Sequence, residues 1–202
     1  NHPSSPKTIY LLSIISLLSL SAISPTLSNV AIIAETEGAS LHTSRPDSKN
    51  FLQTGNTVFA VIVDYGLAGQ NEADVANLVK SWNPNFIVTV GDNNYPHGAD
   101  STVDANIGQY YHDYIFRYNG KYGSGSETNR FFPALGNHDW DQNSGRQQEL
   151  YFTLPGNERY YDFIQGPAHF FVLNSNSTEP EGVNIDSKQA KWLKNGLAIS
   201  TA

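Results

Sequence analysis

A carboxylate, two carboxamides and a phenol follow one another in the run Gly91-Asp92-Asn93-Asn94-Tyr95, directly after the apolar residues 86–90. In α/β proteins, ligands bind at the carboxyl ends of the strands, so a strand that ends in this run directs oxygen ligands toward one point. Oxygen ligands suit a hard metal ion. Asp92 has two oxygens and could bridge two ions, and Tyr95 is close enough to reach one of them. The run predicts a site for one or two metal ions.

Two other apolar runs end in side chains of the same kind. Residues 58–63 end at Asp64, and residues 131–135 precede Gly136-Asn137-His138-Asp139. A helical pattern lies between the strands that end at Asp64 and Asp92, so these strands are predicted to be parallel. The two carboxylates then share one sheet edge, on strands about 4.8 Å apart, and repel each other unless a cation lies between them.

The remaining patterns predict elements that hold these strand ends. Residues 104–116 carry apolar and aromatic side chains on one helical face, which is typical of a core. Residues 159–163 and 169–173 predict an antiparallel pair of strands. Residues 186–199 predict a helix whose buried stripe consists of Ala190, Leu193 and Leu197.

Composition limits the possible partners. The chain has 202 residues, 39% of them hydrophobic, which is enough for one domain with a core. A formal net charge of −7 opposes contacts with a nucleic-acid backbone, so no nucleic acid is expected. Bound cations could still attract a small phosphorylated substrate. The sequence contains no cysteine, so a metal must be held by oxygen and imidazole.

The N-terminal residues 1–28 have the pattern of a signal peptide, because Lys7 precedes an apolar run at residues 9–20 and small residues follow. This run is shorter than the roughly 20 residues that a membrane-spanning helix needs. We therefore expect an exported protein, secreted or periplasmic, with no stable membrane anchor after signal removal. Residues 29–55 are polar and without a sustained period, and predict a flexible linker; residues 56–202 predict the folded domain.

Three motifs together resemble the first three of the five motifs of the calcineurin-like metallophosphoesterases. They are Asp64-Tyr65-Gly66, Gly91-Asp92-Asn93-Asn94-Tyr95 and Gly136-Asn137-His138-Asp139. The tyrosine is similar to that of the purple acid phosphatase branch, including its small tartrate-resistant type. The resemblance implies an α/β fold of two packed mixed β-sheets flanked by helices, in four layers (α/β/β/α). The present residues would form its N-terminal portion, about the first sheet and its helices.

The resemblance also implies a role for each site residue. Asp64 and Tyr95 would bind one metal ion, Asp92 would bridge both ions, and Asn137 would bind the second. His138 would be the catalytic residue that faces the substrate phosphate. The dinuclear centre would pair Fe(III) with divalent Fe, Zn or Mn, because a phenol of pKa near 10 binds as phenolate only to a strongly Lewis-acidic ion. The expected reaction is hydrolysis of phosphate monoesters by a hydroxide that the two ions activate.

The sequence departs from the family pattern in two places. Val63 replaces the glycine of the first motif, and the two later motifs, which would supply three histidine ligands, are not among these residues. We therefore expect the 202-residue chain to be inactive alone and the full-length protein to be an acid phosphatase-like hydrolase. A phosphodiesterase or nucleotidase on the same fold, or a non-catalytic secreted fragment, are the alternatives. His97 is a further candidate for substrate binding, and Asp139 is expected to fix its turn by accepting main-chain hydrogen bonds.

Overall fold

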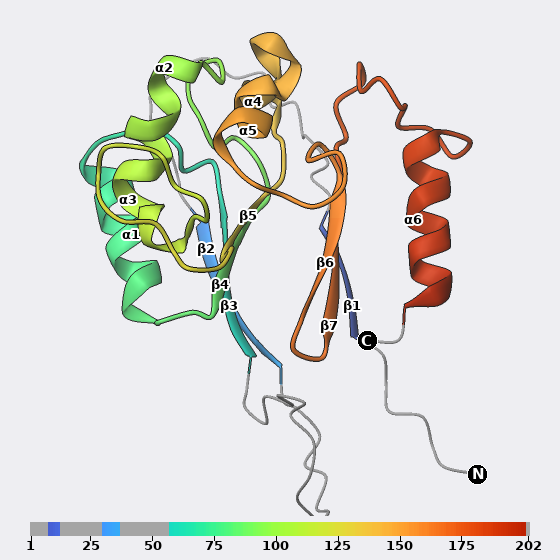
Figure 1. Ribbon diagram of the computed structural model, residues 1–202, viewed down its shortest axis with the longest axis horizontal. Coiled ribbons are helices and arrows are strands. Elements are labelled where there is room, and N and C mark those ends of the chain that lie inside the picture. Colours follow the sequence, from blue (N-terminus) through green and yellow to red (C-terminus); the bar gives the residue numbers. More distant parts are fainter. Residues whose placement is uncertain (1–7, 13–29, 37–56, 201–202) are drawn as a thin grey trace, which may run out of the picture.

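Two β-sheets lie side by side in the middle of the molecule, and helices cover the outer side of each (Figure 1). The structure is a computed structural model, which describes residues 8–12, 30–36 and 57–200. The layers run helix, sheet, sheet, helix. This arrangement confirms the predicted α/β fold with two packed mixed sheets.

The larger sheet has four strands in the order β2-β3-β4-β5. Strands β3 (Thr57–Val63), β4 (Phe86–Thr89) and β5 (Phe131–Pro133) are parallel, and β2 (Val30–Thr36) runs antiparallel to β3. Every residue of β4 and β5 is buried. The parallel strands therefore behave as their continuous apolar sequences predict, with both faces of the sheet covered.

The smaller sheet has three strands in the order β1-β7-β6. Strand β6 (Tyr161–Gln165) turns back into β7 (Ala168–Val172), which confirms the predicted antiparallel pair. Gly166 has φ 57° in this turn, a conformation that glycine adopts without strain. Strand β1 (Thr8–Leu12) lies parallel to β7 on its other side. The chain thus contains strands of both sheets, which is more than the first sheet and its helices that the resemblance implied.

Aromatic side chains fill the space between the two sheets. The ring centroids of Phe59 and Phe170 are 5.1 Å apart, and those of Phe86 and Phe170 are 5.3 Å apart. Phe132 stacks on Phe163 at 3.7 Å. Rings at such distances add specific contacts to the burial of their apolar area. The sheets therefore share one core, which fixes the sheet edges relative to each other.

The outer face of the larger sheet is covered by α1 (Gln70–Ser81), which joins β3 to β4, and by a second helical segment. The second segment covers residues 100–114 and consists of α2 (Asp100–Val103), the π-helical turn η1 (Asp104–Gly108), α3 (Gln109–Tyr111) and the 3₁₀ turn η2 (His112–Tyr114). Its apolar and aromatic face is buried, as predicted, with Ile107, Tyr110, Tyr111 and Tyr114 in the core.

Two short helices, α4 (Asn137–Asp141) and α5 (Arg146–Tyr151), follow β5, with the 3₁₀ turn η3 (Asn143–Gly145) between them. The last helix, α6 (Lys188–Ile199), lies against the outer face of the smaller sheet (Figure 1). The Ser187 side chain caps this helix by accepting a hydrogen bond from the main-chain N–H of Ala190 at 3.0 Å.

The orientation of α6 differs from the prediction. Trp192 packs against Phe171, with ring centroids 5.9 Å apart, and Gly196 lies close to the same phenylalanine. The helix therefore places Trp192 and Gly196 toward the sheet. Leu197 of the predicted buried stripe is 36% exposed, and Ala190 and Leu193 are only half-buried.

Residues 1–28 and 29–55 lie outside the described residues except for β1 and β2. The signal peptide and the linker therefore stay predictions for the rest of these segments. Strand β2 is a difference from the prediction, because it places seven paired residues where a flexible linker was expected. In the part of the chain that the structure describes, no helix has the length and apolar character needed to cross a membrane.

Candidate metal centre

The carboxyl ends of β3 and β4 stay together beyond the strands themselves. The Asp64 N–H donates to the Gly91 carbonyl oxygen at 3.4 Å. Asp64 and Asp92 both have left-handed backbone conformations, with φ 53° and 52°. Aspartate adopts this conformation more readily than most residues. The backbone turns at these two positions and leaves both carboxylates at the same sheet edge, as the sequence predicts.

The Tyr95 hydroxyl lies between these two carboxylates. It donates to Asp64 Oδ1 at 3.0 Å and lies 3.3 Å from Asp92 Oδ2. Three oxygen donors from two strand ends thus converge. All three belong to the predicted ligand set, and the structure brings them into contact.

The electrostatics of this cluster favour a cation. Burial raises the pKa of the Asp92 carboxyl; the nearby His138 lowers it, and Asp64 raises it again. Burial also raises the pKa of the Tyr95 phenol, and the negative charges of Asp92 and Asp64 add to the rise. Each negative group therefore disfavours ionisation of the next. A bound cation would reverse these shifts, because it stabilises the negative form of each group.

The third strand end approaches the same point through Gly136. A Cβ atom on this residue would lie 2.2 Å from Asp92 Oδ1, so only glycine permits the approach. The main-chain N–H of His138 donates to Asp92 Oδ1 at 3.0 Å, and its ring centroid lies 4.4 Å from that of Tyr95. Asn137 lies between Gly136 and His138 in the chain, and its side chain is exposed. The structure thus places Asn137 beside the cluster and His138 in contact with it.

The two carboxamides of the run serve the fold instead of the site. The Asn93 Nδ2 donates to the Ala134 carbonyl oxygen at 2.6 Å, and its Oδ1 accepts from the Tyr65 hydroxyl at 3.0 Å. The Asn94 Nδ2 donates to the Ala99 carbonyl oxygen at 2.8 Å. Both asparagines are almost completely buried. Asp92 and Tyr95 are therefore the residues of this run that reach the cluster.

Asp139 joins the two turns of the site, as the sequence predicts. Its Oδ2 accepts from the Gly136 N–H at 2.8 Å and from Asn93 Nδ2 at 2.8 Å, and its Oδ1 accepts from the Asn93 N–H at 2.9 Å. Burial raises the pKa of this carboxyl to about 6, although the donated hydrogen bonds lower it. Asp139 therefore fixes the turn after β4 against the turn after β5.

The first motif is held by close backbone packing. A Cβ atom on Gly66 would lie 1.7 Å from the Asn93 carbonyl oxygen, so the first and second motifs touch through their main chains. Val63 is the last residue of β3, and the left-handed conformation falls on Asp64. The valine therefore occupies a regular strand position and does not need the backbone freedom of the family's glycine.

The structure identifies the carbonyl group that orients the His138 ring. The His138 Nδ1 lies 2.7 Å from the Pro96 carbonyl oxygen. A carbonyl oxygen can only accept, so Nδ1 carries the hydrogen and Nε2 is left for other partners. A main-chain carbonyl has no signature in the sequence, so only the structure reveals this contact.

His97 lies in the loop next to this contact and is exposed. Its Nδ1 is 2.7 Å from Asp141 Oδ2, and both side chains are more than half exposed. The pair connects the loop after Tyr95 to the end of α4. This contact does not test whether His97 binds substrate, so substrate binding by His97 stays a prediction.

The donor set fits a hard cation. It offers two carboxylates, a phenol and a neighbouring carboxamide, which are oxygen ligands of the kind that hard ions prefer. Among the residues that the structure describes, no group of three or more His, Cys, Asp or Glu side chains is placed to hold a metal ion. The described residues thus bring two of the predicted acidic ligands, Asp64 and Asp92, together with the Tyr95 hydroxyl.

Comparison with protein families identifies the family of the chain. The family model described as calcineurin-like phosphoesterase matches residues 41–196, most of the chain. The chain belongs to this family, whose members generally use a dinuclear metal centre and hydrolyse phosphoesters. Searches of curated proteins and of solved structures gave no match.

Proposed function

We propose that the protein is an acid phosphatase-like enzyme that hydrolyses phosphate monoesters at a centre of Fe(III) and divalent Fe, Zn or Mn. The single observation that carries this proposal is the Tyr95 hydroxyl, which lies 3.0 Å from Asp64 Oδ1 and 3.3 Å from Asp92 Oδ2. A phenol held between two carboxylates becomes a phenolate ligand only where a strongly Lewis-acidic ion offsets the added negative charge. Trivalent iron is the ion that fits this requirement best.

Each residue of the cluster has a role in this proposal. Asp64 and Tyr95 would hold one ion, Asp92 would contact both ions, and Asn137 would hold the second. When bound, the two ions supply Lewis acidity to the phosphate oxygens and lower the pKa of water. In the family pattern, three further histidine ligands belong to two later motifs, which are not among these residues.

His138 is the proposed general acid. Its Nδ1 hydrogen is committed to the Pro96 carbonyl oxygen, so the ring acts as an acid in its imidazolium form, which carries a second proton on Nε2 and gives that proton to the leaving alkoxide. The ring contact with Tyr95 and the main-chain hydrogen bond to Asp92 hold this imidazole beside the metal ligands. A small phosphorylated substrate is the proposed partner, and the sequence pattern supports export.

Iron binding by Tyr95 tests the proposal directly. Addition of Fe(III) to the purified chain should produce a visible tyrosinate-to-iron absorption band, and Tyr95→Phe should abolish it. Tyr122→Phe is the matched control, because Tyr122 lies in a loop and contacts Lys121. A band that persists in Tyr95→Phe would contradict the proposed ligand.

The reaction is tested with a protein that includes the two later histidine motifs. The coding sequence that follows Ala202 should contain the two histidine motifs, and a protein that includes them should cleave an aryl phosphate monoester faster than an aryl diester. The opposite preference would favour a phosphodiesterase. If the following sequence encodes no histidine ligands, the phosphatase proposal fails.

A further inference from the structure

The loop before α6 and the outer side of α6 concentrate the exposed apolar side chains of the molecule. Eight large hydrophobic residues are exposed in the described part of the chain, and four of them lie between residues 183 and 199: Val183, Ile185, Leu197 and Ile199. Ile185 is 87% exposed. The other four are spread over other elements. Exposed apolar residues that gather in one place indicate a contact surface, whereas single ones do not.

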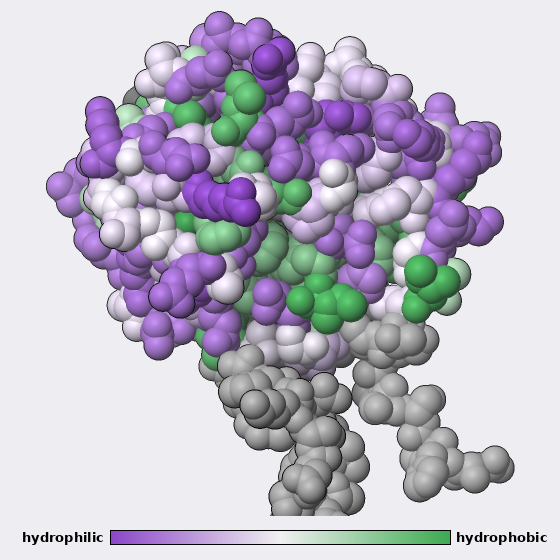
Figure 2. Space-filling view, in the orientation of Figure 1, coloured by the Kyte–Doolittle hydropathy of each residue, from purple (hydrophilic) through white to green (hydrophobic). Residues whose placement is uncertain are grey.

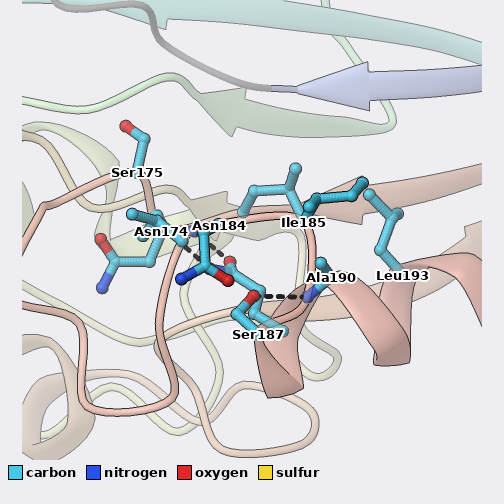
Figure 3. Close-up of a pocket in the computed structure, with 10 residues that line it drawn as sticks. Asn174, Ser175, Asn184, Ile185, Ser187, Ala190 and Leu193 are labelled. Carbon is cyan, nitrogen blue, oxygen red and sulfur yellow. Dashed lines mark hydrogen bonds between the residues drawn. The ribbon is translucent and has the colours of Figure 1, made fainter.

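Two of these side chains, Ile185 and Leu197, border a groove along α6. Ile185, Leu193 and Leu197 line a hollow of about 650 Å³. A smaller cavity of about 260 Å³ adjoins it near the end of β7, and Figure 3 shows Ile185, Ala190 and Leu193 along it. In Figure 2, hydrophobic surface lies beside hydrophilic surface where Figure 1 places α6. The apolar stripe that the sequence predicts to be buried is thus accessible on the outer side of the helix.

The charge of this face is opposite to that of the whole protein. Lys191 and Lys194 line the groove, and Asp186 is the acid that lines it with them. Helix α6 contains three lysines and no acidic residue, whereas the chain has a formal net charge of −7. Lys188 pairs with Glu181 at 2.5 Å, but Lys191 and Lys194 form no ion pair with any described residue. Two cationic groups beside an apolar groove therefore remain for an anionic partner.

We propose that this face of α6 binds the surface of an anionic phospholipid bilayer. Ile185 and Leu197 would enter the boundary between headgroups and acyl chains, and Lys191 and Lys194 would contact the headgroups. A second copy of the chain fits less well, because a symmetric contact through this face would bring the lysines of both copies together. The inference is independent of the phosphatase proposal.

Vesicle flotation tests the apolar part of the surface. The purified chain should float with vesicles of equal parts phosphatidylglycerol and phosphatidylcholine, and much less with pure phosphatidylcholine. Ile185→Asp should weaken binding roughly tenfold, because one apolar side chain is lost from the boundary. Leu150→Asp is the matched control, because Leu150 is 64% exposed on α5, away from this face. This variant should bind the vesicles as the unchanged chain does. Both variants keep the same N-terminal segment, so their difference reports the α6 face alone.

The lysines give a second, independent measurement. Lys191→Gln and Lys194→Gln should each weaken binding to the anionic vesicles about fivefold, and high salt should weaken binding of the unchanged chain. Urea unfolding of each variant establishes that the fold is intact. Equal binding of Ile185→Asp and Leu150→Asp would overturn the proposal, as would equal binding to neutral vesicles. Dimerisation that Ile185→Asp abolishes, without vesicle binding, would identify a second copy as the occupant and also overturn it.

Discussion

Two buried carboxylates, Asp139 beside the metal centre and Glu72 in helix α1, have almost no exposed surface but very different surroundings. Asp139 accepts hydrogen bonds from Gly136 and from both the main chain and the side chain of Asn93. Within the described residues, neither oxygen of Glu72 accepts a hydrogen bond of regular geometry. Burial raises the pKa of Asp139 to about 6 and that of Glu72 to about 8. Because both residues are buried, the hydrogen bonds donated to Asp139 account for most of the difference between the two pKa values.

The difference matches what each residue does in the fold. Asp139 joins two turns that carry Asp92 and Asn137, so its hydrogen bonds hold the site together. Glu72 faces the core near Tyr111, whose hydroxyl lowers the pKa of Glu72 only in part. A buried acid can stay ionised where several donors meet it, and otherwise it keeps its proton. The following experiments change one side of this comparison at a time.

The largest effect on stability is expected at Gly66, because this residue packs against Asn93, a hydrogen-bond partner of Asp139. Gly66→Ala would place a Cβ atom 1.7 Å from the Asn93 carbonyl oxygen and separate the first two motifs. We expect a loss of about 4 kcal/mol or more in the free energy of unfolding. Urea denaturation measures this loss. A variant as stable as the unchanged chain would show that the two turns can move apart.

Removal of the hydrogen-bonding acid should have the next largest effect. Asp139→Ala leaves the main-chain N–H groups of Gly136 and Asn93 buried without their acceptor, at a cost of about 3 kcal/mol. Asp141→Ala is the control two residues away, because Asp141 is more than half exposed. Equal unfolding free energies for the two variants would contradict the role given to Asp139.

Replacement of Glu72 should stabilise the fold, unlike the two substitutions above, and the gain should depend on pH. Its pKa is 4.5 in a free side chain and about 8 in the fold, so the folded state binds this proton more tightly than the unfolded state. The stability from this proton is complete below about pH 4.5 and is lost as the pH rises toward 8. Glu72→Gln should therefore gain about 3 kcal/mol relative to the unchanged chain between about pH 5 and about pH 8. Glu127→Gln, at an exposed position, should show no such trend in urea unfolding.

The smallest effect on stability is expected at His97. Its pairing with Asp141 is exposed to solvent, so His97→Ala should change the unfolding free energy by no more than about 0.5 kcal/mol. A substrate role would appear instead as a higher KM with unchanged kcat in a catalytically active form of the protein. A large loss of stability would show that the loop after Tyr95 depends on this pair.

The strand ends of the site could be predicted because continuous apolar runs and parallel connections leave few alternatives. Asp64, Asp92 and Tyr95 converge for that reason. The burial of Asn93 and Asn94 could not be predicted, because their partners include main-chain carbonyls that have no pattern in the sequence. Carboxamides satisfy buried backbone as readily as they bind metal.

Helical period predicts that a face is apolar but not which face meets the sheet. In α6, the packing of Trp192 on the smaller sheet turns the stripe with Leu197 outward. Helices α4 and α5 were not predicted, because each is six residues or shorter and lacks two full turns of apolar repeat. Strand β2 was missed because polar residues surround its short apolar run, and its pairing with β3 depends on a distant segment.

Strand β1 connects the architecture of the smaller sheet to the fate of the N-terminus. Thr8–Leu12 pairs in parallel register with Ala168–Val172, and the same five residues lie within the predicted signal peptide. A peptidase that removed this signal would also remove the outer neighbour of β7 and leave its main-chain groups on that side unpaired. A molecule from which the signal peptide has been removed therefore cannot have β1 in its smaller sheet. N-terminal sequencing of the mature protein would therefore also report how the smaller sheet is built.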